Sequence, residues 1–458
     1  MAISPAIFRA YDIRGVVTDT LTPAVVEQIG RAYGTECLAR GSHTAVVARD
    51  GRLSGTELVE ALARGIASTG LNVVDIGMVP TPVLYFATHH LNTGTGVMVT
   101  GSHNPPDYNG LKMMIGGDAL FGEGITGLHR RLETGDLEHG QGNISRSEVL
   151  DSYLDRIIGD IKLNRPMRIA YDCGNGVAGV AAPALFDRLG CQSTALFTEV
   201  DGKFPNHHPD PAREENLVDL KNAVAKDQCE LGLAFDGDGD RVGVIDNNGN
   251  IIWPDRQMIL YARDMLQRNP GARVVYDVKC SRLLPAAISD AGGVPDMWKT
   301  GHSFMKGRMK ETGALLGGEM SGHIFFKERW FGFDDALYAA ARLLEILSAD
   351  ARPVSEIFGE IPDSVNTPEI NISFSREGAH HEFMQAFIRQ NTFSGATLTE
   401  IDGLRADYDD GWGLIRASNT TPSLVIRFEA DNATALDRIQ TEFSTAMKAV
   451  DSDLVIPF

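Results

Sequence analysis

Three aspartates in one short segment are the first residues whose types and spacing could do chemistry. The residues are Asp236, Asp238 and Asp240, and a single glycine separates each from the next. These glycines, Gly237 and Gly239, allow the segment to turn. Two bare carboxylates about 4 Å apart repel by about 4 kcal/mol at an effective dielectric of 20. Oxygen ligands favour a hard ion such as Mg²⁺ to relieve this repulsion.

The acidic segment has two alternative interpretations. An EF-hand is excluded, because the positions that need Gly and Glu hold Arg241 and Asn247. A solvated acidic turn is the plainer alternative, which the apolar run before the segment makes less favourable.

A serine in a second polar turn is a candidate phosphate carrier. Ser102 follows the apolar run Val97–Thr100, and an exposed hydroxyl in a tight turn is what a nucleophile requires. The turn does not match the GxSxG elbow of hydrolases, because Thr100 and Asn104 replace the two glycines. Alone, such a serine is more often structural, but a metal turn elsewhere in the chain favours a carrier. Phosphorylation would add about −1.5 to −2 charge there, which Mg²⁺ and a Lys or Arg could offset.

Two further polar turns offer hydrogen-bonding groups. One turn combines a guanidinium, two hydroxyls and an amide, which suits a phosphate group: Arg416, Ser418, Asn419 and Thr420. An ordinary turn before a strand is the alternative for these residues. The other turn alternates acceptors and donors, which suits sugar hydroxyls: Glu319, Ser321 and His323.

The segments that must position these turns recur three times. In each repeat a helix-like segment and a second apolar run follow a first apolar run, which ends in an aspartate: Asp50, Asp172 or Asp277. A third apolar run then opens into the serine turn, the acidic turn or the Glu319 turn. Continuous apolar strands between amphipathic helices predict α/β units with buried, mostly parallel strands. Ligands usually bind at the carboxyl ends of such strands.

The C-terminal part of the chain has a different pattern. It predicts a strand at 368–374, a helix at 377–390, a strand at 424–428 and a long amphipathic helix at 433–450. We therefore predict three related α/β domains with mixed, largely parallel sheets and a smaller C-terminal α+β domain. The predicted boundaries are 1–147, 148–250, 251–362 and 363–458.

The composition narrows the classes of partner. The 458 residues include 42 Lys and Arg against 61 Asp and Glu, a net charge of −19, which excludes nucleic acid and anionic membranes as expected partners. An anionic substrate then needs a local basic pocket, which the Arg416 turn would supply. Five separated cysteines without a CxxC pair favour a reducing compartment. No apolar run long enough to span a membrane and no apolar signal-peptide core are present, so we expect a cytoplasmic protein.

We interpret the adjacent His207 and His208 as structural.

The polar turns belong to five segments that follow one another in the order Tyr11–Gly15, TGSHNPPDYNGLK from Thr100, DGDGDR from Asp236, GEMSGH from Gly318 and RASNTTP from Arg416. Together they resemble the α-D-phosphohexomutase superfamily, in particular its bacterial phosphomannomutase/phosphoglucomutase branch. The resemblance covers essentially the whole chain and implies a four-domain architecture that matches the predicted repeat. The GEMSGH segment resembles the mannose and glucose branch more than the glucosamine branch. Gly101 is one departure, because many relatives have Ala there.

The resemblance also implies roles for individual residues. Ser102 would be the phosphoserine and, once phosphorylated, would bind Mg²⁺ together with Asp236, Asp238 and Asp240. Glu319 and Ser321 would bind the sugar O3 and O4 hydroxyls. The non-reacting phosphate would be held by Arg416, Ser418, Asn419 and Thr420. Further positions that line the family's active-site cleft are Tyr11, Arg14, Lys112, Arg241, Lys279, His302 and His323.

The implied reaction interconverts hexose 1-phosphate and hexose 6-phosphate of glucose, mannose or both. It would run through a 1,6-bisphosphate of glucose or mannose, which also serves as activator, in a monomer or weak oligomer. Lys112 and Arg241 would offset charge on the transferred group. His323, Lys112 and Arg14 are candidates for the general base, and the sequence does not rank them. A phosphatase that hydrolyses phospho-Ser102, or a catalytically silent sugar-phosphate binding protein, are the alternatives.

Overall fold

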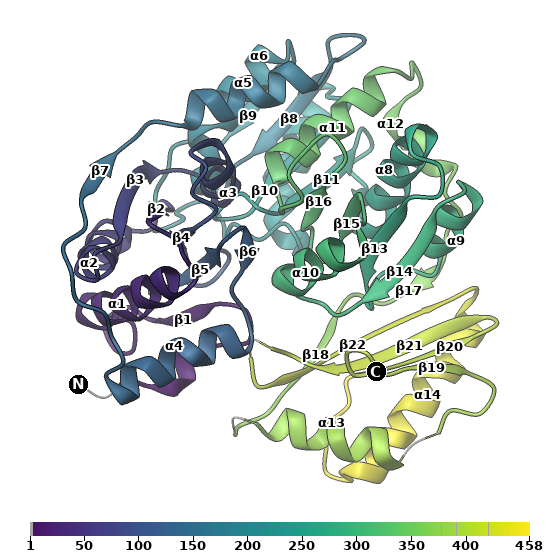
Figure 1. Cartoon of the computed structure of the whole chain (residues 1–458). Coiled ribbons are helices and arrows are strands. Elements are labelled where there is room, and N and C mark those ends of the chain that lie inside the picture. Colours follow the sequence, from purple (N-terminus) through teal and green to yellow (C-terminus); the bar gives the residue numbers. More distant parts are fainter. Residues whose placement is uncertain (1–2, 377, 391, 420) are drawn as a thin grey trace.

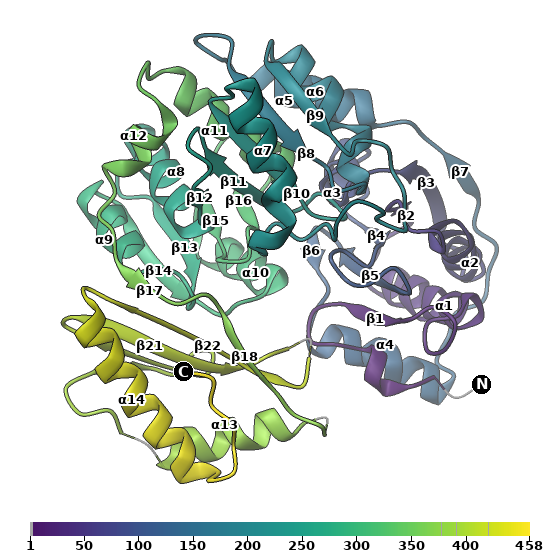
Figure 2. The same cartoon turned by 180° about the vertical axis from the view of Figure 1, so that it is seen from behind.

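The computed structural model describes residues 3–376, 378–390, 392–419 and 421–458, which form four sheets (Figures 1 and 2). Three sheets are mixed and carry helices, and the fourth is antiparallel. We call each sheet with its helices a unit, numbered first to fourth along the chain. The fourth unit, in yellow, lies below the other three in Figure 1. This architecture confirms the predicted fold class.

The first three units share one strand arrangement. A central strand pairs in parallel with a strand on each side, and one of these neighbours continues into an antiparallel strand. In this order the strands are β2 (Thr44–Arg49), β3 (Asn72–Met78), β4 (Gly96–Val99) and β5 (Tyr108–Ile115) in the first unit; β8 (Arg168–Asp172), β9 (Gln192–Leu196), β10 (Leu231–Phe235) and β11 (Val242–Asp246) in the second; and β13 (Arg273–Asp277), β14 (Val294–Trp298), β15 (Leu316–Gly318) and β16 (Ile324–Phe326) in the third.

This arrangement places each polar turn at an equivalent point. The serine turn joins β4 to β5, the acidic turn joins β10 to β11, and the Glu319 turn joins β15 to β16. Strands β4, β10 and β15 are fully buried, as expected for strands covered on both of their faces. Short strands extend the sheets: β1 (Ile13–Val16), β6 (Asp118–Ala119) and β7 (Ile144–Arg146) in the first unit and β12 (Ile251–Ile252) in the second.

Helices cover the three mixed sheets (Figures 1 and 2). Their bounds are α1 (Pro23–Ala39), α2 (Gly55–Ala67), α3 (Thr81–His90), α4 (Glu123–Thr134), α5 (Leu150–Asp160), α6 (Ala182–Arg188), α7 (Val218–Asp227), α8 (Pro254–Arg268), α9 (Leu283–Asp290), α10 (His302–Thr312), α11 (Ala336–Ser348) and α12 (Val354–Gly359). Helix α1 shows a typical start: Thr22 caps it by accepting a hydrogen bond from Val25 N, and Pro23 occupies the first turn. Among the described residues, no helix is both long and apolar enough to cross a membrane.

The fourth unit contains more strands than its sequence pattern indicated. Its strands are β17 (Val365–Asn366), β18 (Ile370–Ser373), β19 (Thr397–Thr399), β20 (Leu404–Tyr408), β21 (Gly411–Ala417) and β22 (Ser423–Ala430), and its helices are α13 (Ala379–Gln390) and α14 (Ala433–Val450). The predicted start of the first helix, residue 377, lies outside the described residues. One prediction is wrong: Arg416 was placed in a turn, but it lies near the end of strand β21, because it pairs with Val425 of β22.

The first three units are packed together, whereas the fourth has its own core. One apolar cluster contains Phe86 of α3, Tyr153 of α5 and Trp330 of the third unit, and the fourth unit has a separate cluster around Phe443. The ring centroids of Phe86 and Tyr153 lie 5.6 Å apart, and those of Tyr153 and Trp330 lie 6.1 Å apart. Elements from three units therefore share one interior, which fixes their polar turns relative to one another.

Two buried arginines attach the fourth unit to the third. Arg405 donates hydrogen bonds to the carbonyls of Val278 and Cys280, at 2.7 and 2.9 Å, and Arg427 donates to the carbonyl of Lys279. The Arg405 guanidinium also lies 3.9 Å from the centre of the Trp412 ring. These contacts fix the backbone around Lys279, a predicted substrate-binding residue.

Asp335 links the second and third units and provides a prediction about stability. It caps α11 by accepting from Tyr338 N at 2.9 Å, and it accepts from Tyr153 Oη at 2.8 Å and Trp330 Nε1 at 3.2 Å. Burial raises the pKa of this carboxyl to about 7. Between the ordinary pKa near 3.8 and this value, the folded state holds a proton that the unfolded state lacks.

We therefore expect the free energy of unfolding to fall as the pH rises from about 5 to 7. Asp335→Asn removes this contribution, which amounts to at most about 1.4 kcal/mol per pH unit for one proton. Urea unfolding at several pH values checks the difference in slope between the two proteins. The control is Asp363→Asn, which changes an aspartate whose side chain is 94% exposed and should keep the wild-type slope. Equal slopes for all three proteins would contradict the prediction.

Candidate active site

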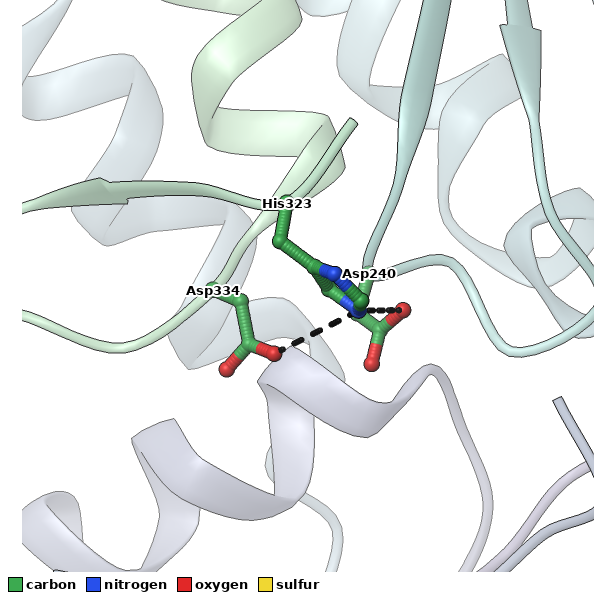
Figure 3. Close-up of side chains that lie close together, drawn as sticks. All are labelled: Asp240, His323 and Asp334. Atoms are coloured by element: carbon green, nitrogen blue, oxygen red, sulfur yellow. Dashed lines mark ion pairs between the residues drawn. The ribbon is translucent and has the colours of Figure 1, made fainter. Parts of the chain in front are cut away.

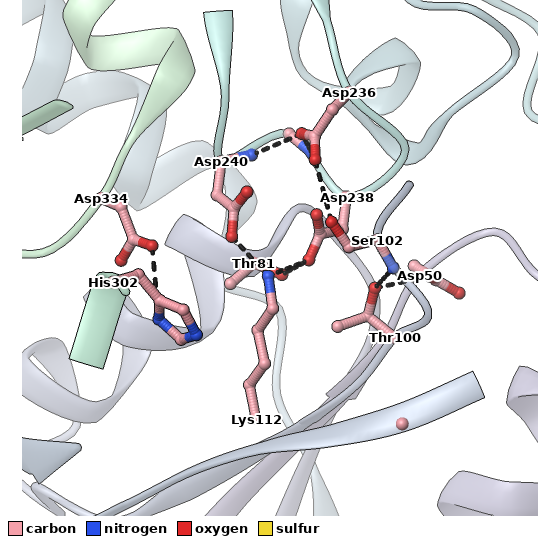
Figure 4. Close-up of polar contacts among 12 residues, drawn as sticks. Asp50, Thr81, Thr100, Ser102, Lys112, Asp236, Asp238, Asp240, His302 and Asp334 are labelled. Carbon is pink, nitrogen blue, oxygen red and sulfur yellow. Dashed lines mark hydrogen bonds and ion pairs between the residues drawn. The ribbon is translucent and has the colours of Figure 1, made fainter. Parts of the chain in front are cut away.

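The serine turn and the acidic turn meet in the buried interior between the first and second units (Figure 4). Ser102 Oγ lies 3.0 Å from Asp236 Oδ2, and Ser102 is almost completely buried, so the expectation of an exposed hydroxyl is wrong because the acidic turn packs over the serine. The two turns also approach through their backbones, since a Cβ on Gly237 would lie 2.4 Å from the Ser102 carbonyl oxygen. Glycine is therefore required at 237 for the two turns to come this close.

The three aspartates of the acidic turn fit a hard divalent cation. Each offers a carboxylate oxygen, and these oxygens lie within 4.8 Å of one another. Asp238 Oδ1 is buried and has no hydrogen-bond partner among the described residues, so it is available to a metal ion. Burial, together with the charges of Asp240 and Asp238, raises the pKa of Asp236 well above its ordinary value.

The other Asp236 oxygen holds the turn in shape. Asp236 Oδ1 accepts hydrogen bonds from the backbone N–H groups of Gly239, Asp240 and Arg241, at 3.0, 3.1 and 3.2 Å. Gly239 adopts a φ of 75°, a conformation that favours glycine. One oxygen of this carboxylate therefore organises the backbone, while the other faces Ser102.

Lys112 of β5 supplies a positive charge to this acidic centre. Its Nζ lies 2.7 Å from Asp238 Oδ2 and 2.5 Å from Asp240 Oδ2. Burial opposes the charge, but the two carboxylates outweigh it and hold the pKa of Lys112 well above its ordinary value. Thr81 Oγ1, at the start of α3, also donates to Asp238 Oδ2 at 2.6 Å. The first unit thus contributes the serine, a cation and a hydrogen-bond donor to the acidic turn of the second.

His323 connects the acidic turn to the Glu319 turn (Figure 3). Its Nε2 lies 3.3 Å from Asp240 Oδ1 and 3.8 Å from Asp334 Oδ2, and its Nδ1 lies 3.0 Å from Glu319 Oε2. Burial lowers its pKa, but Asp240 and Glu319 outweigh this effect and raise the pKa of His323 to about 9. The imidazole therefore carries a positive charge at neutral pH. A backbone bridge between Arg241 and His323 joins the same two turns.

The remaining predicted residues of the third unit surround the Glu319 turn. Ser321 Oγ lies 3.0 Å from His323 Nδ1. Glu319 Oε1 accepts a hydrogen bond from the backbone N–H of Gly301. The His302 ring meets the Tyr11 ring edge-on, with 5.4 Å between centroids. Lys279 Nζ lies 4.0 Å from Asp277 Oδ2 at the end of β13. It also forms an ion pair with Glu369 of the fourth unit.

The Arg416 segment faces this group from the fourth unit. Arg416 Nε donates to Asp402 Oδ2 at 2.9 Å, and the same carboxylate oxygen accepts from Thr300 N of the third unit at 3.0 Å. Ser418 is buried, whereas Asn419 is partly exposed. Thr420 lies outside the described residues.

Most of the predicted residues are brought into one network of contacts. The network comprises Ser102, Lys112, Asp236, Asp238, Asp240, Arg241, Glu319, Ser321 and His323. Arg14, whose guanidinium pairs with Asp12 and Asn104, lies beside the serine turn. Tyr11, His302, Lys279 and the Arg416 segment lie next to this network.

Several residues of the site were not predicted from the sequence. Asp334 lies beside His323 and accepts from Lys306 Nζ at 2.9 Å, and Thr81 contacts Asp238. Neither Asp334 nor Thr81 stands in a segment with a recognisable pattern, so only their positions in the folded chain identify them.

The adjacent histidines lie close to the site in supporting positions. His207 Nε2 lies 3.0 Å from Asp172 Oδ2, and His208 Nε2 contacts the His103 carbonyl of the serine turn. The two rings therefore contact different partners, and their structural interpretation stays a prediction.

Profiles of known protein families match most of the chain. Family profiles of phosphoglucomutase/phosphomannomutase match α/β/α domain I at residues 5–136, domain II at 151–249, domain III at 253–365 and the C-terminal domain at 369–446.

Individual relatives agree with these profiles. The chain is 56% identical to a phosphomannomutase/phosphoglucomutase of Pseudomonas aeruginosa, covering 99% of this chain and 98% of the relative. It is 52% identical to a phosphoglucomutase of Neisseria gonorrhoeae, covering 98% of each. A crystal structure of a phosphoglucomutase/phosphomannomutase family protein from Burkholderia thailandensis superimposes with a TM-score of 0.94 at 50% identity, over 100% of both chains. The chain therefore belongs to the phosphoglucomutase/phosphomannomutase family of the α-D-phosphohexomutase superfamily.

Proposed function

We propose that the protein is a phosphohexomutase that interconverts hexose 1-phosphates and hexose 6-phosphates of glucose, mannose or both. The observation that carries this proposal is the contact between Ser102 Oγ and Asp236, which places a buried hydroxyl 3.0 Å from a turn that fits Mg²⁺. The names of the relatives from Pseudomonas and Neisseria, which include both sugars, support the same reaction.

The proposed reaction has two phosphoryl transfers. In the first, the bond between phosphorus and Ser102 Oγ breaks while O6 of a hexose 1-phosphate forms a bond to phosphorus; the 6-hydroxyl loses its proton and the leaving Ser102 Oγ takes one up. The product is a hexose 1,6-bisphosphate. In the second transfer, the bond between the 1-phosphoryl phosphorus and the sugar O1 breaks and Ser102 Oγ forms the bond to phosphorus; the serine hydroxyl loses its proton and O1 takes one up, which releases hexose 6-phosphate. The bisphosphate is therefore both intermediate and activator.

Charge neutralisation is the main contribution of the protein to these transfers. Bound by Asp236, Asp238 and Asp240, Mg²⁺ would supply a positive charge that stabilises the oxygens of the transferred group. Lys112 and Arg241 lie beside the same carboxylates and would offset further negative charge.

Proton transfer to and from the sugar oxygens needs a group of the protein. His323, Lys112 and Arg14 each pair with a carboxylate that holds them in their protonated form. Each can therefore donate a proton to a leaving sugar oxygen, and each would act as a general base only after losing its own proton. All three stay candidates for this role.

The remaining roles concern the sugar and its second phosphate. Glu319 and Ser321 would bind sugar hydroxyls, and the substrate would contact Tyr11, Lys279 and His302 beside them. The non-reacting phosphate would be held by Arg416, Ser418, Asn419 and Thr420. The contact of Asp402 with both Arg416 and Thr300 N supports this role, because the next backbone N–H, that of Gly301, donates to Glu319. A bidentate guanidinium suits a phosphate that must be bound in either orientation of the sugar.

We also propose domain boundaries at 147, 250 and 362 and a cytoplasmic location. Strand β7 ends at Arg146 within the first sheet, and α5 begins at Leu150, which supports the first boundary. The separated free cysteines support a reducing compartment.

The proposed activity is tested by phosphorus NMR. We expect the protein with Mg²⁺ and a trace of glucose 1,6-bisphosphate to convert glucose 1-phosphate and mannose 1-phosphate to the 6-phosphates. Ser102→Ala abolishes conversion because it removes the phosphoryl acceptor, whereas Ser68→Ala, at the exposed end of α2, keeps the wild-type rate. Accumulation of inorganic phosphate would show a phosphatase instead, and binding without turnover would show a silent sugar-phosphate binding protein.

The proposed metal site is tested by calorimetric titration with Mg²⁺ in the absence of substrate. We expect Asp238→Asn to weaken binding by at least about tenfold, because it removes a charged ligand of a hard cation. Asp246→Asn is the matched control: Asp246 is also buried, but it accepts hydrogen bonds from Asn248 N and Asn250 N in the next turn. Equal Mg²⁺ affinity of Asp238→Asn and the wild type would rule out this metal site.

A further inference from the structure

The serine turn holds Ser102 in a backbone conformation that needs support. Its φ is 48°, in the left-handed region that residues other than glycine, asparagine and aspartate adopt rarely. Conformations of this kind persist where surrounding contacts fix them. The contacts that fix Ser102 come from residues outside the proposed catalytic and substrate-binding set.

A chain of hydrogen bonds runs from Asp50 to the backbone of Ser102 (Figure 4). Thr100 Oγ1 donates to Asp50 Oδ2 at 2.7 Å and accepts from Ser102 N at 2.8 Å. Gly101 N donates to the same carboxylate oxygen at 3.2 Å. All of these groups are buried, which strengthens the bonds. The carboxylate of Asp50 therefore fixes the two residues before the serine and, through Thr100, the serine amide.

Arg52 holds the other side of the same turn. Its Nη2 donates to the carbonyls of Ser102 and Asn104, at 2.8 and 2.6 Å, and its Nη1 donates to those of Pro105 and Tyr108, at 2.5 and 2.9 Å. The side chain is fully buried, with its Nε 3.3 Å from the Asp50 carboxylate. One guanidinium thus binds four backbone carbonyls, three in the turn and one at the start of β5.

Gly101 provides the space for this guanidinium. A Cβ at position 101 would lie 2.4 Å from Arg52 Cζ, which is far inside van der Waals contact. The ring of Phe204, from the second unit, covers the guanidinium with 5.4 Å from Cζ to its centroid. The departure at Gly101 noted in the sequence is therefore matched to a tightly enclosed Arg52 in this protein.

The third unit repeats part of this arrangement. Asp277 ends the central strand β13, as Asp50 follows β2, and its Oδ1 accepts a hydrogen bond from Met320 N in the Glu319 turn at 3.2 Å. The aspartate that closes the central strand thus braces the neighbouring polar turn in both units. In the second unit Asp172 instead binds Gly174 N and the side chain of a histidine in a neighbouring loop.

We propose that Asp50, Thr100 and Arg52 are positioning residues for phosphoryl transfer at Ser102. Their hydrogen bonds to the backbone of the serine turn hold Ser102 so that its Oγ points at the acidic turn. This inference rests on the proposed mutase function. It predicts that losing these hydrogen bonds lowers kcat and leaves KM for the hexose phosphate unchanged. The Glu319 turn and the Arg416 segment, which are proposed to bind the sugar and its second phosphate, lie on the third and fourth units.

The test compares Thr100→Val with Thr100→Ser and with Thr88→Val. Valine keeps the size of threonine and removes the hydroxyl between Asp50 and Ser102 N, whereas serine retains it. Thr88 is an equally buried threonine in the first unit, whose hydroxyl donates to the Tyr85 carbonyl away from the serine turn. Steady-state kinetics with glucose 1-phosphate, Mg²⁺ and glucose 1,6-bisphosphate give kcat and KM, and thermal melting reports on the fold.

We expect Thr100→Val to lower kcat by at least about tenfold, because small misplacements of a reacting group have effects of this size, while KM stays within about twofold of the wild-type value. Thr100→Ser restores kcat, and Thr88→Val leaves kcat unchanged. Arg52→Lys, which cannot reach four carbonyls with one ammonium group, gives the same loss of kcat and serves if Thr100→Val does not fold.

Two results would overturn the inference: wild-type kcat in either folded variant, Thr100→Val or Arg52→Lys, or a loss of activity that appears in KM. An inactive wild type contradicts the mutase function itself and is thereby distinguished from a failure of the positioning role.

Discussion

The structure depends on how a dense cluster of negative charge is accommodated in its interior. Asp236, Asp238 and Asp240 are completely buried within one turn, a situation that is unfavourable unless positive charge and hydrogen-bond donors surround them. The cations that contact Asp238 and Asp240 come from neighbouring units: Lys112 belongs to the first and His323 to the third. The packing of the three units therefore brings in the positive charges that neutralise the acidic turn.

The local parts of this arrangement could be predicted from the sequence. Apolar runs followed by polar turns identified the three related units, because buried parallel strands have continuous apolar residues, and acidic spacing identified the candidate metal site. Contacts between units have no such signature. Asp334 and Thr81 reach the site only because separate units pack together, and Asp50 was recognised as the end of an apolar run but not as a support of Ser102. Arg416 was misplaced because its polar neighbours resemble a loop, whereas strand pairing with β22 extends through position 417.

The four units are not equally joined. The first three share an apolar core around Phe86 and Tyr153, while the fourth has its own core and is attached through Arg405 and Arg427 to the backbone around Lys279. Packed interiors transmit position with little slack, so the serine, acidic and Glu319 turns are held rigidly with respect to one another. The Arg416 segment depends for its position on polar contacts to the backbone around Lys279 and on the small apolar cluster of Val278, Trp412 and Leu414.

The division of the site among repeated turns has a consequence for how such a protein can diversify. Ser102 and the three aspartates proposed to act in the transfer lie on the β4–β5 and β10–β11 turns, whereas Glu319, Ser321 and Arg416, proposed to bind the ligand, lie on the β15–β16 turn and at the end of β21. His323 contacts both sets. Each turn is anchored by its own strands, and Asp50 and Asp277 brace two of them separately. Substitutions on the Glu319 turn or the Arg416 segment that keep His323 would therefore change the proposed ligand contacts without altering Ser102 or the three aspartates, so the two halves of the site are separable by mutation.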